Sequence, residues 1–251
     1  MPISLPVPLL ENAGLAYVGE PVWPPATLME REATELMDAV NACGRPNADV
    51  LRRRLAVVHG APDETWQVDF PPHFTPQEAA LYERPLRHLQ RRSGGIWHNP
   101  HANPDLRRAL ARVSRFLATP AEVPPPDWRW IEDELLPDAT LLVVPRDDDF
   151  TRGVLSGEVF AQWHQAYHAK LGAAPSVTAF PFPWAPTTPL SSLNPAQEEQ
   201  RHAIARAARA NDAARIDAAV LAAYGWPTDL PPAELLEKLL GLNHARAGSG
   251  T

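Results

Sequence analysis

Residues 141–171, LLVVPRDDDFTRGVLSGEVFAQWHQAYHAKL, contain the two elements that decide the predicted fold. The four apolar residues Leu141–Val144 have the length and composition of a buried strand. After them, large apolar side chains recur every three or four residues, as in an amphipathic helix, at Phe160, Trp163, Tyr167 and Leu171. We expect this helix to pack on the sheet that contains the strand. The fold class is therefore mixed α and β.

Towards the N-terminus the sequence predicts three helices. The first begins at the capping-box pair Thr27 and Glu30 and ends near Gly44. The second begins at Thr75, with proline at its first helical position. The third begins at Pro104 and carries an apolar stripe made by Leu106, Leu110, Val113 and Leu117.

Two short strands are predicted at residues 65–69 and 128–131, and the proline-rich residues 119–126 are expected to be irregular. Closely spaced prolines between residues 175 and 189 predict an extended linker, and helices with a break at Gly225 follow it. We therefore predict a mixed α/β (α+β) domain over residues 1–185 and a small C-terminal helical domain over residues 186–251.

The composition narrows the classes of protein. A chain of 251 residues with 45% hydrophobic content is able to bury a core. The single cysteine, Cys43, excludes an internal disulfide and a cysteine-rich zinc site. The apolar runs are too short to cross a bilayer and the first residues lack a secretory signal, so we expect a cytoplasmic protein without a membrane partner.

Charge is distributed unevenly along the chain. The net charge is −7, yet residues 84–115 contain eight arginines and one acid, Asp105, which leaves −14 for the remainder. Arginine suits phosphate and guanine edges, although a GC-rich genome produces the same excess of arginine over lysine. The clustering predicts a basic surface on the helix from Pro104, with Arg107, Arg108, Arg112 and Arg115 mostly towards solvent.

No catalytic or metal-binding motif is recognisable. The segment Asp69–Phe74 departs from the Asp/Asn-Pro-Pro-aromatic motif of amino-group methyltransferases, and no glycine-rich cofactor turn precedes it. The segment Gly153–Gly157 (GVLSG) lacks the Gly-x-Ser-x-Gly nucleophile elbow. His98, His101 and the aspartates 147–149 lack the spacing of a metal site. We therefore assign no catalytic residue, metal or cofactor to this chain.

Ordered segments over nearly the whole sequence resemble the C-terminal third of MmeI-like (type IIL) restriction-modification enzymes and related adenine-specific DNA methyltransferases. The matching segments are Gly14–Gly19, Asn47–Arg52, Gln67–Phe70, Pro104–Leu110, Gly153–Ser156, Phe180–Pro183, Ile216–Val220, Ala223–Trp226 and Leu239–Asn243. The nuclease and methyltransferase domains that precede this region in the family are not in the chain, and its helical tail is shorter between Pro189 and Asp212.

The resemblance implies a target-recognition domain that reads double-stranded DNA for a methyltransferase subunit or domain, which would use S-adenosylmethionine. Phosphate contacts are then expected from Arg91, Arg92, Arg107, Arg108 and Arg112. Base readers are expected at Glu122, Asp127 and Arg129, which lie before the Gly-Val-Leu-Ser segment. Trp97 and His98 are candidates for a further DNA-contact loop.

Other functions remain open at this point. The acidic remainder of the chain also fits a protein-interaction module that modulates a methyltransferase, and the chain also fits a remnant of a larger split enzyme. A small enzyme with an unrecognised site is a third class.

Overall fold

The computed structural model describes residues 5–42, 44–122, 126–132 and 134–248, so Cys43 and part of the proline-rich segment 119–126 lie outside it. The chain divides into two compact units, each built from separate stretches of sequence. Unit 1 comprises Met1–Tyr17, Ala109–Ile131 and Leu142–Thr251, and unit 2 comprises Val18–Arg108 and Glu132–Leu141. The expected domain boundary at residue 185 falls inside unit 1.

Unit 2 is organised around a four-stranded sheet in the order β2-β4-β3-β7. The strands are β2 (Thr27–Leu28), β3 (Leu51–Val58), β4 (Ala61–Val68) and β7 (Leu136–Pro137). β3 and β4 form an antiparallel hairpin, while β7 pairs with β3 in the parallel direction. The hairpin turn is His59-Gly60, and both residues have positive φ, as a two-residue turn of this hand requires.

Four short helices accompany this sheet: α1 (Glu30–Met37), α2 (Pro76–Ala79), α3 (Glu83–Ser93) and α4 (Pro104–Leu110). The predicted capping box is present at α2, where Thr75 accepts from the Glu78 N–H and Glu78 accepts from the Thr75 N–H. Apolar side chains from the sheet, α1 and α3 form one core, which includes Leu28, Val68, Phe70, Tyr82 and Leu89.

Unit 1 contains the second four-stranded sheet, in the order β1-β8-β5-β6. Its strands are β1 (Tyr17–Val18), β5 (Phe116–Pro120), β6 (Arg129–Ile131) and β8 (Leu141–Val144). All four residues of β8 are buried, as predicted for this strand. The helix after it is also confirmed, as α6 (Glu158–Leu171), with Phe160, Trp163 and Tyr167 in the core.

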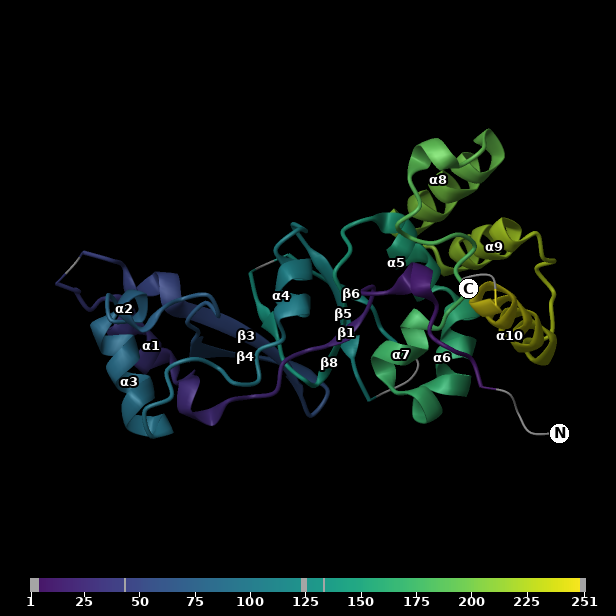
Figure 1. Ribbon diagram of the computed structural model, residues 1–251. Coiled ribbons are helices and arrows are strands. Elements are labelled where there is room, and N and C mark those ends of the chain that lie inside the picture. Colours follow the sequence, from purple (N-terminus) through teal and green to yellow (C-terminus); the bar gives the residue numbers. More distant parts are fainter. Residues whose placement is uncertain (1–4, 43, 123–125, 133, 249–251) are drawn as a thin grey trace. The chain divides into compact units, whose positions relative to one another are not determined.

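Helices make up the rest of unit 1: α5 (Asp149–Ser156), α7 (Ala173–Thr178), α8 (Pro195–Arg209), α9 (Ala213–Tyr224) and α10 (Pro232–Gly248). The three C-terminal helices gather near α5 and α6 (Figure 1), and α8 and α9 both pack on α5. The predicted break at Gly225 is confirmed as the left-handed C-cap of α9. Among the described residues, no helix combines the length and apolar character needed to cross a membrane.

Several predicted boundaries were wrong because tertiary pairing overrides local signals. Thr27 lies in β2, and the N-cap of α1 is Met29, two residues later, where Glu32 accepts from the Met29 N–H. The helix from Pro104 ends at Leu110, so Val113 lies beyond it and Leu117 lies in β5. β5 also includes Thr119 and Pro120, which were expected to be irregular.

The predicted proline-rich linker is a buried part of unit 1. Phe180 and Phe182 are fully buried in its core. The side-chain amide of Asn12 donates to the Phe180 carbonyl, and that of Asn243 donates to the Ala179 carbonyl. The first of the prolines, Pro175, lies in helix α7, and the backbone carbonyls that follow this helix are satisfied by side chains that are distant in sequence.

The Gly-Val-Leu-Ser segment has a packing role that its glycines explain. A Cβ on Gly153 would lie 2.6 Å from Ile204 Cγ2 and 3.1 Å from the Ile204 carbonyl oxygen on α8. The absence of a side chain therefore lets α5 and α8 approach closely. Asp217 on α9 caps the next helix, since its carboxylate accepts from the Glu158 N–H at 2.7 Å.

We expect Gly153→Ala to destabilise the protein by about 1–3 kcal/mol, because overpacking forces α5 and α8 apart. The matched control is Gly241→Ala in α10, where an added Cβ meets nothing within 4 Å. That change should be neutral or stabilise by up to about 1 kcal/mol. Urea denaturation followed by tryptophan fluorescence measures both changes, and equal stabilities of the two variants would contradict the close approach.

Candidate nucleic-acid interface

Arg107 lies in a buried ion network in unit 2. Its guanidinium donates to both carboxylate oxygens of Glu20, at 2.7 and 2.8 Å, and to both oxygens of Asp69, at 2.9 Å each. The side chain of Arg107 is only 15% exposed, and that of Glu20 is fully buried. The expectation that Arg107 faces solvent is therefore wrong. Its fork is fully engaged by two carboxylates.

The pKa values of this network follow from burial and pairing. Burial raises the pKa of Asp69 above its ordinary value, against the opposing effect of Arg107. Burial alone would lower the pKa of Arg107, but its hydrogen bonds and attraction to Glu20 and Asp69 raise it above the ordinary value. Arg107 thus remains charged, and its charge neutralises neighbours within unit 2.

A second buried arginine extends the same network. Arg54 on β3 is almost fully buried and donates to the Asp138 carboxylate at 2.6 Å and to the Gln67 side-chain oxygen at 3.0 Å. It also donates to the Glu20 backbone carbonyl at 2.7 Å. No local pattern indicates this role, because Arg54 belongs to a run of three arginines, Arg52–Arg54, which is typical of an exposed segment.

Four exposed arginines of the basic segment lie on α3. Arg84, Arg87 and Arg91 follow one side of the helix at helical spacing, and with Arg92 and His88 they line one depression of the surface. Among the described residues, Arg84, Arg87 and Arg91 have no ion pair. We call these three residues and Arg92 the α3 arginine face.

The other predicted phosphate contacts are elsewhere. Arg108 is exposed but pairs with Asp105 at 2.9 Å on the same turn of α4. Arg112 is exposed and belongs to unit 1. Arg115, also in unit 1, lies over the Trp130 ring at 3.9 Å and contacts Asp149 at 3.3 Å. The basic segment therefore separates into the buried Arg107, the α3 arginine face and the paired Arg108 in unit 2, and Arg112 and Arg115 in unit 1.

Two of the predicted base readers, Asp127 and Arg129, lie at the start of β6, and the third, Glu122, follows β5. Glu122, Asp127 and Arg129 are all exposed. The Nε and Nη2 atoms of Arg129 donate to Asp127 Oδ2 at 3.0 and 2.8 Å, and both side chains are about two-thirds exposed. The Nη1 edge of the arginine fork faces no described acceptor.

The two residues of the predicted contact loop have different surroundings: Trp97 is packed and His98 is exposed. Trp97 packs edge-on against Phe70, with ring centroids 6.0 Å apart, and joins the core of unit 2. His98 next to it is exposed. A packing role thus accounts for Trp97.

The aspartate triplet at residues 147–149 orders the start of α5. Asp148 caps the helix by accepting from the Thr151 N–H at 2.8 Å, and it pairs with Arg146. Asp149 pairs with Arg115 and Arg209. Within the described part of the chain, no group of three or more acidic, histidine or cysteine side chains is placed to hold a metal.

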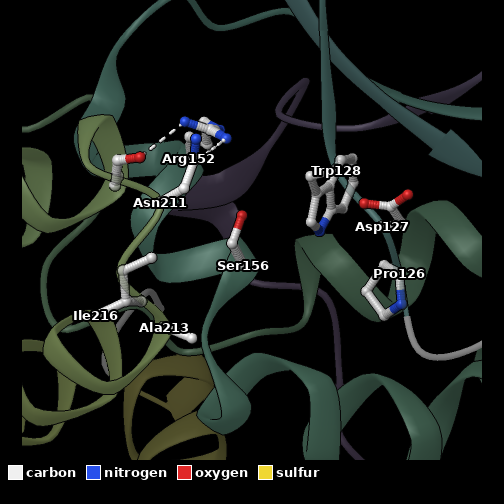
Figure 2. A pocket seen from close by; sticks show the side chains of 9 residues that line it. Pro126, Asp127, Trp128, Arg152, Ser156, Asn211, Ala213 and Ile216 are labelled. Atoms are coloured by element: carbon white, nitrogen blue, oxygen red, sulfur yellow. Dashed lines mark hydrogen bonds between the residues drawn. The ribbon is translucent and has the colours of Figure 1, made fainter.

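Unit 1 contains a pocket of about 220 Å³. It lies between the segment before β6, which includes Asp127, and helices α8 and α9. Figure 2 shows its walls, which come from the segment before β6, from α5 and from the α8–α9 turn. The polar lining residues are Asp127, Trp128, Arg152, Ser156 and Asn211. Sequence reasoning selected Asp127 but missed the others, because their convergence depends on the packing of α5 against α8.

Comparisons with known proteins indicate the fold. No protein-family model matches the sequence, and no curated protein matches it. A solved structure described as the type IIL restriction-modification enzyme MmeI in complex with DNA is similar over 98% of this chain, with a TM-score of 0.56 and 12% identity. The chain covers 36% of that enzyme's chain. The two proteins therefore share a related fold over nearly all of this sequence.

We expect Arg107→Ala to destabilise unit 2 by about 3–5 kcal/mol, because it leaves Glu20 and Asp69 buried without a counter-charge. Arg108→Ala, one residue away and 62% exposed at its side chain, should cost less than about 1 kcal/mol. Chemical denaturation of both variants measures the difference. Similar small losses for both would show that the buried network does not stabilise unit 2.

Proposed function

We propose that this chain is the DNA sequence-recognition module of an adenine-specific DNA methyltransferase or restriction-modification system and is not catalytic by itself. The observation that carries the proposal is the fold shared, over 98% of the chain, with part of an enzyme whose structure is a DNA complex. The catalytic partner, a methyltransferase subunit or domain, would bind S-adenosylmethionine. This chain would supply the choice of site.

The α3 arginine face supports the sequence-independent part of binding. Its guanidinium groups are exposed and share one depression, and Arg84, Arg87 and Arg91 form no ion pair with a carboxylate in the part of the chain that the structure describes. Phosphate contacts of this kind provide affinity and register but no choice of sequence. The proposal therefore transfers the main phosphate role from Arg107 to α3 and keeps Arg91 and Arg92. Arg108 and Arg112 remain proposed secondary contacts.

The Asp127–Arg129 pair supports the base-reading part. Arginine reads guanine with two parallel N–H groups directed at O6 and N7. Because Asp127 occupies the Nε side of the Arg129 fork, the Nη1 and Nη2 hydrogens on the opposite edge are available to a base. Glu122 is an exposed carboxylate that would accept from a cytosine amino group. His98 remains a proposed contact in the loop after α3.

The double variant Arg87→Ala/Arg91→Ala should weaken binding to all duplex sequences alike. Loss of two phosphate contacts should also reduce the slope of log affinity against log salt by about 2. Fluorescence anisotropy with random duplex DNA over a range of salt concentrations measures both quantities.

The matched control for the double variant is Arg206→Ala, an exposed arginine on α8 that pairs with Glu199. We expect it to leave the affinity and the slope unchanged. If the double variant retains both the wild-type affinity and the wild-type slope, α3 does not contact phosphate.

Arg129→Ala should change sequence preference while retaining most non-specific affinity. Selection of bound duplexes from a random library should show relaxed preference at one base pair, which corresponds to about 1–3 kcal/mol of lost discrimination. Arg206→Ala again serves as the control. An equal loss of affinity for every sequence would contradict a reading role for Arg129.

A protein-interaction module that modulates a methyltransferase is the second candidate, and the net −14 of the chain outside residues 84–115 favours it. It predicts no binding to duplex DNA in the absence of the methyltransferase. The salt titration with random duplex DNA thus discriminates between the two functions.

A further inference from the structure

Two residues that line the pocket in unit 1, Trp128 and Arg152, each carry a buried N–H group without an acceptor among the described residues. The Trp128 side chain is 4% exposed overall, and its indole Nε1 has no hydrogen-bond partner among the described residues. The same is true of Nε of Arg152 on α5. In Figure 2 the indole nitrogen lies on the side of the Trp128 ring that faces Ser156 and the pocket. Buried donors are almost always paired, so two in one pocket indicate a missing acceptor.

Arg152 also lacks a counter-charge. Its Nη1 donates to the Ala208 carbonyl at 2.8 Å and its Nη2 donates to the Asn211 side-chain oxygen, and both acceptors are uncharged. No ion pair with a described carboxylate neutralises it. Asn211 is held at φ 50°, in the left-handed region that most residues avoid, and its side chain orients the guanidinium. A partly buried cation among neutral partners favours an anionic ligand.

The remaining polar groups leave this positive balance intact. The Asp127 carboxylate lines the pocket too, but Arg129 neutralises it. Ser156 adds an exposed hydroxyl from the last turn of α5. Three hydrogen-bond donors, Trp128, Arg152 and Ser156, therefore line one pocket. Among the described lining residues, Arg152 carries the charge that no ion pair neutralises.

We propose that this pocket binds a phosphate group. A phosphate offers three or more acceptor oxygens for the donors of Trp128, Arg152 and Ser156, whereas a carboxylate offers two. The volume of about 220 Å³ is below the range of about 300–1,000 Å³ that whole small-molecule ligands occupy. The pocket therefore fits one charged group of a larger molecule. The source is either a DNA backbone phosphate or a free phosphorylated compound.

Isothermal titration with inorganic phosphate, against chloride at equal ionic strength, tests the proposal on the full chain. Wild-type protein should bind phosphate, and the midpoint of thermal unfolding should rise with phosphate concentration. Trp128→Phe keeps an aromatic ring but removes the N–H, and Ser156→Ala removes an exposed hydroxyl. Each variant should weaken phosphate binding about tenfold, as expected for one hydrogen bond to a charged group.

Trp184→Phe is the matched control. Trp184 is also a buried tryptophan of unit 1 whose indole nitrogen has no described partner, but it does not line this pocket. Its substitution should leave phosphate binding unchanged. Absence of phosphate-specific binding in wild-type protein, or equal binding by wild type, Trp128→Phe and Ser156→Ala, would overturn the proposal.

Duplex DNA in the same titration distinguishes the two sources. If the pocket holds a backbone phosphate, inorganic phosphate competes with duplex DNA, and Trp128→Phe weakens duplex binding for all sequences. If it holds a free phosphorylated compound, Trp128→Phe weakens phosphate binding and leaves duplex binding intact. Either result supports the pocket. Failure of the proposed DNA function alone would appear as phosphate binding without duplex binding.

Discussion

A buried ion network around Glu20 holds together segments of unit 2 that are far apart in sequence. The Glu20 carboxylate accepts from Arg107 and from the Asn103 N–H, and its backbone carbonyl accepts from Arg54. Arg54 continues the network to Asp138. Segments that are far apart in sequence are thereby held at fixed positions, including the short stretch 132–141 that returns to this unit. Buried charges tolerate little displacement, because each depends on its partner for the solvation it has lost.

This network separates the arginines by role. Arg107 uses four of its five N–H donors on carboxylates of its own unit, whereas Arg84, Arg87 and Arg91 of the α3 arginine face form no ion pair with a described carboxylate. Charge clustering in the sequence therefore overstates the basic surface. Three arginines that lack an ion pair within the described part of the chain are therefore found on α3, and the proposed DNA function depends on them together with the proposed readers Asp127 and Arg129.

Unit 1 shows how segments separated in sequence complete one site. Gly153 permits α8 to lie close to α5, and this contact places the α8–α9 turn opposite the segment before β6. Residues of α8, α9 and the turn between them therefore line the same pocket as Asp127 and Trp128. Such an arrangement explains why the chain does not divide at residue 185: the helices that follow bury their apolar faces on α5 and α6.

Elements with strong local signals were predictable from the amino-acid sequence alone: the strand Leu141–Val144, the helix over 160–171 and the end of a helix at Gly225. Their causes are hydrophobic period, run length and the left-handed conformation open to glycine, which need no distant partner. The sequence also placed Asp127 and Arg129 together, since they are two residues apart. Three other features became visible in the three-dimensional structure: Arg54 and Arg107 are buried, the proline-rich segment is part of the core, and Trp128 and Arg152 line one pocket. Those features depend on partners that are tens of residues away in sequence. Burial determines whether an arginine stabilises the fold or is available to a ligand, and no local sequence pattern encodes burial.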